Sequence, residues 1–541
     1  MRAVALASFA LCVTVSAPAQ NDYPSLVALH EEFQKLKAPK VTTGVPDYTP
    51  AAMRTQHAAL GELRKRLDAM DPRVWPVPQQ VDYLVVRAQM DELDFHHRVL
   101  RPWARDPGFY VDMLRPVAFA KLPVEQEKLE GFRTGLAAVP ALLKQARQNL
   151  TEGAGELADF ALRNLEKHDG VGHEQPLRSV PPPGILGWFD ELVYGLEKHH
   201  PELVPDGRRA RQAVAEFHEW LKRERPRMTA RAGIGLENYN WLLKNVRLMT
   251  YTADDIARIG DRELARTLAG LALERHRNRH LPELLPAASE AEYAMKIADA
   301  DRHVREFIRT QEFLTIPDYI GEMDNNVPWI VRPGGRNFWE QVQFRDPRPD
   351  KVHAGIPGHR FDIAIHERDK RPIRGRYTDS ARIEGWGFYL EEGMMNAGLL
   401  DDLPRTRELF WIFAAARAVR NRAELHMHTG EWTVEQAIDY MVKNVPFMDP
   451  DVARVDCEIY LRTPTYGMSY QMGKLQIERL LAERARQLGE TFRLGEFHDQ
   501  FLAAGTIPVS LIRWEITGFD DEVREFLPAT STAEARSPRT E

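Results

Sequence analysis

Apolar residues recur at spacings of three and four along most of this chain, which is the period of a helix with one buried face. Stretches in which apolar and polar residues alternate, as in a half-buried strand, are few. The period predicts helices over six long segments: Met53–Asp71, Val81–Leu100, Val124–Gln148, Ala154–His168, Ala210–Arg223 and Ala253–Arg275. We therefore expect a mostly α-helical fold.

Several of the expected helices also carry start signals. Thr252, Ser289 and Thr433 each stand just before acidic or amide side chains, the arrangement that caps a helix N-terminus. Proline and glycine interrupt the helical pattern at residues 179–187 and 325–350. The second interruption lies directly before the histidines described below, so it is the best candidate for strands or an active-site loop.

The composition is that of a globular protein. Of the 541 residues, 43 % are hydrophobic and 28 % are charged, which is too apolar for general disorder. The length predicts a single large domain over residues 20–527, in two lobes, and a disordered tail at 528–541 that is rich in Ser, Thr, Ala and Arg. The net charge is −7 and no long basic run occurs, so no nucleic-acid partner is expected.

The N-terminus has the pattern of a secretory signal peptide. Arg2 supplies a positive charge, residues 3–15 are apolar, and Ser16–Ala19 have the small residues of a cleavage site. Cleavage of residues 1–19 would export the chain to the periplasm or beyond; a buried first helix is the less favoured interpretation. The mature chain would keep Cys457 alone, so no intrachain disulfide could form, and no later segment is apolar for long enough to span a membrane.

Residues 351–367 read KVHAGIPGHRFDIAIHE and contain two histidines six positions apart. In a regular helix His353 and His359 would point about 120° apart, and the usual zincin spacing of four is not met. Pro357 and Gly358 interrupt a regular helix, and a break there could bring both imidazoles to one point. On spacing alone, however, two scattered histidines near a turn are the simpler interpretation.

A carboxylate in the next helical segment changes that balance. Residues 381–392 read ARIEGWGFYLEE, in which Glu384 is followed by Gly385, a residue small enough to let a backbone or a ligand approach. Two histidines and one glutamate form a ligand set of catalytic zinc that leaves room for water. Taken alone, Glu384 would be interpreted as a solvated helix carboxylate.

Four ordered blocks of the sequence resemble one bacterial family. Residues 353–359, with their Pro-Gly pair, and residues 382–389 (RIEGWGFY) resemble the H-E-x-x-P-G-H and R-x-E-G-W-x-x-Y motifs of domain-of-unknown-function family 885. Residues 428–437 and 464–473 resemble two further motifs of that family. The resemblance covers about residues 325–490. The family is similar to helical zinc peptidases of the gluzincin type, such as Taq-type carboxypeptidases and relatives of angiotensin-converting enzyme.

The resemblance implies a fold and a metal site. The fold would be a helical zincin-like fold, in which two helical lobes flank a deep cleft and a few short strands lie near the metal site. Zinc would be bound by His353, His359 and Glu384, although this ligand set does not exclude other divalent metals. The substrate would be a short peptide or a related small acyl compound.

The sequence departs from the family motifs at positions that the resemblance places at the reaction site. The family's glutamate after the first histidine is Ala354 here, the residue after the second histidine is Arg360, and Thr465 and Tyr466 replace a Gly-Gln pair. In a zinc peptidase that glutamate carries a proton from water to the leaving amine, a step worth about 10²–10⁴-fold, and alanine cannot perform it. Amide hydrolysis would suffer most, because an amine must be protonated to leave, whereas an ester has a better leaving group.

Other side chains are candidates for parts of this chemistry. Candidates for a replacement base or proton relay are Asp362, Glu367, Glu391 and His366. By analogy with related helical zincins, His428 and Tyr470 could hold the developing oxyanion, or could instead be a helix-end histidine and a core tyrosine. Arg360 and Arg420 could bind a substrate carboxylate, although each also fits an ordinary ion pair.

The sequence therefore favours an exported metallohydrolase of peptidase ancestry. The alternative is a catalytically degenerate protein that binds a metal or a ligand, because the expected base is absent at Ala354. A helical protein with no metal would require the four ordered blocks to be a coincidence.

Overall fold

The computed structural model describes residues 21–173, 175–323, 326–332 and 334–528. The predicted signal peptide at 1–19, and residues 529–541 of the predicted tail, lie outside the described residues. In the first half of the chain the helices are α1 (Tyr23–Lys37), α2 (Pro50–Asp68), α3 (Val77–Phe95), α4 (Pro102–Arg105), α5 (Pro107–Asp112), α6 (Arg115–Ala118), α7 (Leu129–Asn149), α8 (Gly155–Glu166), α9 (Gly184–His199), α10 (Val204–Glu224), α11 (Gly235–Asn245) and α12 (Ala253–Arg277).

The second half continues in the same style. Its α-helices are α13 (Glu290–Thr310), α14 (Phe338–Gln343), α15 (Arg348–Asp350), α16 (His359–His366), α17 (Ser380–Asn396), α18 (Pro404–Thr429), α19 (Val434–Asn444), α20 (Pro450–Arg462), α21 (Ser469–Leu488), α22 (Leu494–Ala503) and α23 (Val509–Thr517). Two π-helical turns are η2 (His96–Leu100) and η5 (Lys351–Gly355). Short 3₁₀ turns are η1 (Pro72–Val74), η3 (Pro201–Leu203), η4 (Arg225–Arg227), η6 (Arg374–Arg376), η7 (Gly489–Thr491) and η8 (Arg524–Phe526).

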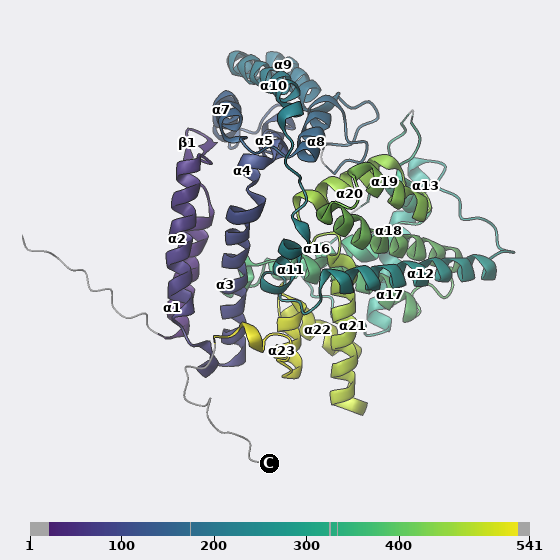
Figure 1. The fold of residues 1–541 in the computed structure, drawn as a ribbon. Coiled ribbons are helices and arrows are strands. Elements are labelled where there is room, and N and C mark those ends of the chain that lie inside the picture. The colour runs from purple at the N-terminus through teal and green to yellow at the C-terminus, as the bar shows by residue number, and fades with distance from the viewer. Residues whose placement is uncertain (1–20, 174, 324–325, 333, 529–541) are drawn as a thin grey trace, which may run out of the picture.

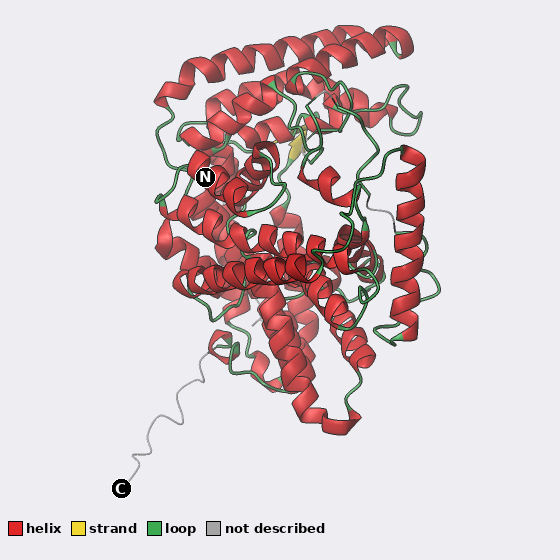
Figure 2. Ribbon diagram, turned by 90° about the vertical axis from the view of Figure 1, so that its right-hand side faces the viewer, coloured by secondary structure: helices red, strands yellow, loops and turns green. Residues whose placement is uncertain are grey.

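The fold is mostly helical, as the apolar period predicts (Figure 2). Each of the six segments predicted as helical coincides with a helix, to within a few residues at the ends. Thr252 and Thr433 form capping boxes at the starts of α12 and α19, and the side chain of Ser289 caps α13. The helix period and the caps are local signals, which is why the sequence predicts them well.

The expectation of strands near the histidines is wrong for the described residues. The two described strands, β1 (Val41–Thr42) and β2 (Val45–Pro46), pair antiparallel near the N-terminus, and β2 packs against α7. Residues 326–332 form an irregular loop, and α14 and α15 follow it. The backbone N–H of Val327 donates to the side chain of Gln343 at 2.9 Å, so this loop is bound by a side chain rather than by a neighbouring strand.

The helices pack into a continuous body in which the two ends of the chain meet. The first three helices lie side by side along one flank of the molecule, and α9 and α10 lie together at one end of it (Figure 1). Apolar residues of α1–α3 share one core with those of α17 and α21–α23. Apolar residues of the consecutive helices from α5 to α10 form a second core, and a third core surrounds α18 and α20. Helix α18 runs along α12 and is buried on nearly all sides, as expected of a central helix.

Helices α17 and α21 cross so closely that only glycine fits at the contact. A Cβ atom on Gly473 would lie 1.8 Å from the carbonyl oxygen of Ala381, and one on Gly385 would lie 2.5 Å from the Cα of Gly473. The close approach predicted for Gly385 is therefore made by another backbone. It brings the loop that precedes α21 next to Glu384.

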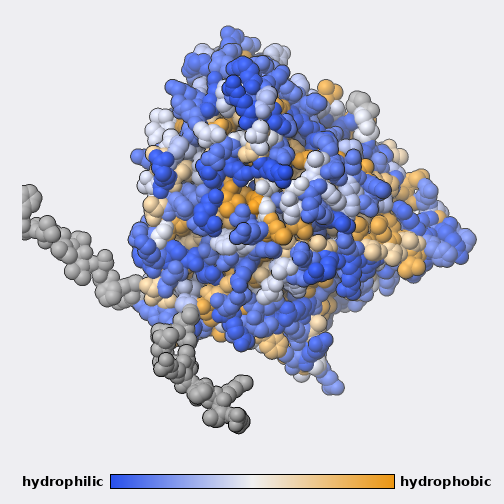
Figure 3. Space-filling view, in the orientation of Figure 1, coloured by the Kyte–Doolittle hydropathy of each residue, from blue (hydrophilic) through white to orange (hydrophobic). Residues whose placement is uncertain are grey.

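The surface seen in Figure 3 is largely hydrophilic, with apolar residues gathered toward its middle. Among the described residues, none of the helices is both long and apolar enough to cross a bilayer.

Candidate metal centre

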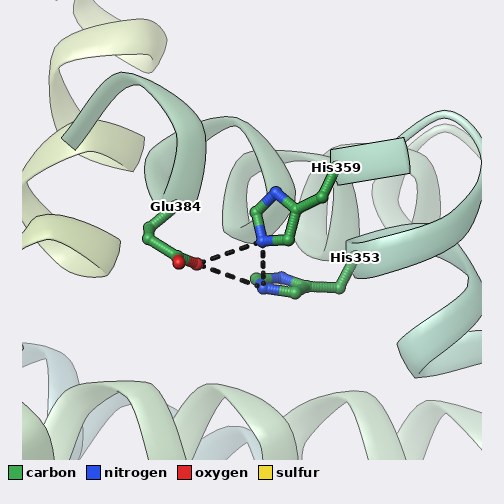
Figure 4. Close-up of side chains that lie close together, drawn as sticks. All are labelled: His353, His359 and Glu384. Atoms are coloured by element: carbon green, nitrogen blue, oxygen red, sulfur yellow. Dashed lines mark hydrogen bonds and ion pairs between the residues drawn. The ribbon is translucent and has the colours of Figure 1, made fainter. Parts of the chain in front are cut away.

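The chain breaks its helix between the two histidines. His353 lies in the π-helical turn η5, residues 356–358 form a tight connection, and His359 begins α16. A Cβ on Gly358 would lie 1.9 Å from the carbonyl oxygen of His353, so the chain folds back on itself where only glycine can. The break brings the two imidazoles together, with 3.1 Å between their Nε2 atoms (Figure 4).

The third member of the cluster is Glu384, one turn into α17. Its Oε2 atom lies 3.1 Å from Nε2 of His359 and 3.5 Å from Nε2 of His353 (Figure 4). All three ligand atoms lie within 4.8 Å of one another. His353 and Glu384 are buried, and His359 is half-buried at the edge of a cavity. The structure thus brings together the three residues predicted as metal ligands.

The far side of the His353 ring is held by a second carboxylate. Nδ1 of His353 lies 2.7 Å from Oε1 of Glu391, which stands two helical turns after Glu384 on α17. Gly387, between them, makes room for the ring, because a Cβ there would lie 2.8 Å from two ring atoms. A carboxylate on Nδ1 turns the lone pair of Nε2 toward the cluster, which is the usual support of a histidine that binds metal.

The other oxygen of Glu384 is also occupied. The hydroxyl of Tyr466 donates to Oε1 of Glu384 at 2.5 Å. Burial raises the pKa of Tyr466, and the nearby charge of Glu384 raises it further, so the phenol keeps its proton and remains a donor. Oε2 is left to face the two imidazoles.

The electrostatics of the cluster favour a positive charge at its centre. Burial alone would raise the pKa of Glu384, but the imidazoles of His359 and His353 hold it well below its usual range. Burial and Arg417 lower the pKa of His353, yet its contacts with Glu384 and Glu391 outweigh them and raise it. A buried carboxylate faced by two imidazole nitrogens has the chemistry of a divalent-metal site, so these donors fit a metal ion.

A cavity of about 800 Å³ opens beside the cluster. Its wall includes the three clustered residues and Ala354, which is 9 % exposed and stands at the glutamate position of the H-E-x-x-P-G-H motif. Three arginines, Arg360, Arg417 and Arg420, also line it. The remaining wall is rich in aromatic side chains: Tyr293, Trp329, Trp339, Tyr460, Tyr466 and Tyr470. A concave wall of this size that combines aromatic surface with charged groups can bind a small molecule.

Two of the other predicted site residues lie on the inner wall of this cavity. The ring of Tyr470 is nearly parallel to that of His353, with centroids 6.1 Å apart. Arg420 is buried, pairs with Asp456 through bonds of 2.9 and 3.0 Å, and lies over the Tyr470 ring at 4.4 Å. Arg360 is an exposed residue of the cavity wall.

Asp362 and His428 are not brought to the cluster. Both oxygens of Asp362 accept hydrogen bonds from the buried guanidinium of Arg382, at 2.7 and 3.0 Å, and neither residue lines the cavity. His428 donates from Nε2 to the carbonyl of Tyr460 at 3.0 Å and borders a separate, smaller cavity. Burial lowers the pKa of His428 to about 4, so it is a neutral core histidine.

The remaining replacement bases are also elsewhere. Glu391 is bound to His353, Glu367 is exposed, and the ring of His366 contacts Thr506 at 3.2 Å. None of the three lines the cavity.

Sequence reasoning missed the roles of Glu391 and Tyr466. The seven-residue spacing of Glu384 and Glu391 on one helix places both on the same face, and this was the available signal for Glu391. For Tyr466 there was no local signal, because its contact with Glu384 joins residues 82 positions apart.

Comparisons with known proteins agree with the fold. The family model described as "Bacterial protein of unknown function (DUF885)" matches residues 36–312 and 351–516, more than half of the chain. Two solved structures are similar over nearly their whole length, and both are described as a "putative lipoprotein", the first "of unknown function". The one from Shewanella oneidensis has 16 % identity and a TM-score of 0.70, and covers 91 % of this chain and 99 % of its own. The one from Colwellia psychrerythraea has 16 % identity and a TM-score of 0.71, with 92 % and 99 % covered.

At that identity the likeness shows the fold alone. No curated protein matches the sequence.

Proposed function

This chain belongs to the DUF885 family of bacterial proteins, and we propose that it is an exported metallohydrolase of peptidase ancestry. Its metal, zinc in the first instance, is held by His353, His359 and Glu384. The scaffold is zincin-like, with helical lobes on either side of the cavity. The observation that carries the proposal is the supported cluster itself: three ligand atoms within 4.8 Å, with Glu391 behind one of them and Tyr466 behind another.

The cluster opens on space for a substrate. A divalent metal bound there would supply Lewis acidity, polarising a carbonyl and lowering the pKa of a water molecule. The protein supplies the walls, and the cavity of about 800 Å³ suits a short peptide or a small acyl compound rather than a folded chain.

The inner wall favours a substrate with an anionic group. The guanidinium groups of Arg417 and Arg420 lie 5.1 and 4.4 Å from the Tyr470 ring, which in turn lies against His353. Nε of Arg417 and Nη1 of Arg420 are buried without a hydrogen-bond partner among the described residues. A substrate carboxylate near them would give these two N–H groups an acceptor, and Arg360 adds a further cation to the wall.

Because position 354 has no glutamate, the site favours substrates with a good leaving group. Besides Glu384, the carboxylates on the cavity wall are Glu290, Asp350 and Asp456 among the described residues. Asp456 is engaged by Arg420. Asp350 ends α15, directly before the turn η5 that carries Ala354. We expect hydrolysis of activated esters to exceed hydrolysis of amides, because the alcohol product needs less proton donation.

The alternative is a metal- or ligand-binding protein without hydrolytic activity, and Ala354 is the observation that favours it. The two possibilities share the metal site and differ only in turnover.

Export is supported by the sequence pattern of residues 1–19 and by the descriptions of the two solved relatives as lipoproteins.

The metal is tested first. The protein purified without chelator should contain about one zinc or other divalent ion per chain by plasma emission spectroscopy, and His353→Ala should lose it. His428→Ala is the matched control, since that histidine is equally buried but lies outside the cluster. A wild-type protein that neither retains nor binds zinc would end the proposal.

Activity is tested next with paired ester and amide substrates of the same acyl group, on the wild type and on Ala354→Glu. Ester turnover by the wild type that disappears in His353→Ala supports the hydrolase. A gain of about 10²-fold or more in amide hydrolysis by Ala354→Glu would identify a lost proton carrier. Metal binding without turnover of any substrate would favour the alternative.

A further inference from the structure

The two oxygens of Glu384 have different environments. Oε2 faces both imidazoles, at 3.1 Å from His359 and 3.5 Å from His353, while Oε1 accepts the hydroxyl of Tyr466 at 2.5 Å. Glu384 is buried and Tyr466 is half-buried, so water competes less for this bond than it would on the surface. A hydrogen bond to a charged acceptor in such surroundings is about twice as strong as one between neutral groups.

The backbone that carries Tyr466 is itself held by a buried carboxylate. Residues 463–468 connect α20 to α21 and pass over the buried carboxylate of Glu424, which belongs to α18. Oε2 of Glu424 accepts the backbone N–H of Met468 at 2.8 Å and the hydroxyl of Tyr239 at 3.1 Å. A Cβ on Gly467 would lie 3.1 Å from it, so the loop is drawn tightly over the acid.

A buried arginine makes a second contact with this loop. Nε of the buried Arg247 donates to Oγ1 of Thr465 at 2.9 Å. With Thr465 held before Tyr466 and Met468 held two residues after it, the phenol has a set direction toward Glu384. Packing alone does not require the hydroxyl, since the ring also contacts Tyr460 and Tyr470 at centroid distances of 6.3 and 6.0 Å.

We propose that Tyr466 is a positioning residue for the metal centre: the loop over Glu424 aims its hydroxyl at Oε1 of Glu384, so that Glu384 offers the metal a single oxygen, Oε2. This inference rests on the proposed metal site. One carboxylate oxygen and two imidazoles give three protein donors and leave a position open for water or substrate. Groups that orient a ligand from behind typically contribute 10- to 100-fold to metal affinity.

The test compares the Zn²⁺ affinity of the metal-free protein and its variants by competition with a chromogenic chelator. Tyr466→Phe keeps the ring and removes the hydroxyl, and should weaken Zn²⁺ binding about 10- to 100-fold. Tyr466→Gln restores a donor at this position, the residue type expected there from the family resemblance, and should regain most of the affinity. Tyr460→Phe, which removes a hydroxyl from the same cavity without touching Glu384, should bind Zn²⁺ as the wild type does.

Thermal unfolding of the metal-free variants separates positioning from folding. Tyr466→Phe should unfold within a few degrees of the wild type while its Zn²⁺ affinity falls. Equal Zn²⁺ affinity in Tyr466→Phe and the wild type would overturn the positioning role and leave the metal site intact. A wild type that binds no Zn²⁺ would overturn the metal site itself, and the positioning role with it.

Discussion

At the scale of single residues, Thr465 holds a backbone conformation that a β-branched side chain rarely adopts. Its φ is +72°, in the left-handed region, where glycine and asparagine are favoured. The resembling family has glycine at this position, so the chain departs from it where the backbone most needs freedom. Its hydroxyl stabilises this conformation, because it accepts a hydrogen bond from Arg247 and donates one to the carbonyl of Pro464. Strain of this kind costs about 1–3 kcal/mol and is concentrated at functional sites.

Replacing Thr465 by asparagine should therefore stabilise the protein by about 1 kcal/mol, because asparagine tolerates positive φ and its Oδ1 can still accept from Arg247. Thr465→Ala removes the acceptor without relieving the strain and should destabilise. Urea unfolding of the two variants beside the wild type makes the comparison. An asparagine variant no more stable than the wild type would show that the strain at this position is not significant.

Asp362 illustrates a residue whose contacts give it a structural role. Because it binds Arg382 through both oxygens inside the protein, Asp362→Asn leaves a buried guanidinium poorly compensated and should cost about 3 kcal/mol of stability. Zinc affinity per folded molecule should remain within a few-fold of the wild type. A lost alkaline or acidic limb in the pH–rate profile of Asp362→Asn would instead identify it as the proton carrier.

At the scale of elements, α17 combines three tasks on three of its faces. Glu384, Gly387 and Glu391 face His353, Gly385 meets α21, and Trp386 donates from its indole to the carbonyl of Pro357 at 3.0 Å. The helix can do this because small residues alternate with large ones along it. The crossing of α17 and α21 sets the position of α17, and with it the position of Glu384 in the cluster.

A methyl group at the crossing should therefore disturb both stability and metal binding. Gly473→Ala would place its Cβ 1.8 Å from the carbonyl of Ala381, and the separation of the helices needed to admit it should cost about 3 kcal/mol. Gly393→Ala, on the partner helix α17, is the matched control: its Cβ meets Tyr389 at 3.6 Å, an ordinary contact, and should stabilise by about 0.5–1 kcal/mol. Differential scanning calorimetry measures the stability of both variants. Similar changes of unfolding temperature in the two variants would contradict the importance of the crossing.

At the scale of the whole molecule, a buried charge network joins the first third of the chain to the last. Arg462, at the end of α20, binds Asp106 at 2.7 Å and also Asp112 at the end of α5. Glu458 lies one turn earlier on α20 and accepts from Asn164 of α8 at 2.9 Å. Burial, together with the charges of Asp112 and Asp106, raises the pKa of Glu458 to about 7 against the opposing effect of Arg462.

This raised pKa makes stability depend on pH in a defined direction. An unfolded chain releases the Glu458 proton near its ordinary value of 4.5, whereas the folded chain keeps it to about pH 7. The folded state therefore holds the extra proton between these values, so the free energy of unfolding falls as the pH rises across this window, by up to about 1.4 kcal/mol per pH unit. Glu458→Gln should reduce that slope, while Glu490→Gln, at an exposed carboxylate, should keep the wild-type slope. An unchanged slope in Glu458→Gln would exclude Glu458 as its source.

The sequence by itself determined the elements and the identity of the candidate ligands. The helix period, the caps at Thr252 and Thr433 and the interruption at Pro357–Gly358 are properties of neighbouring residues, so they could be predicted without knowledge of the fold. The two histidines and Glu384 were selected by residue type and by family resemblance, and only 25 positions separate His359 from Glu384.

Only the tertiary structure decided what surrounds those ligands. Asp362 and His428 have the right chemistry for a site, yet Arg382 and the carbonyl of Tyr460 engage them elsewhere. Tyr466 had no signal in the sequence, and it became a partner of Glu384 because α17 and α21 cross at two glycines and Glu424 holds the connecting loop. These contacts join segments tens of positions apart, and their geometry follows from how helices pack rather than from any pattern along one helix.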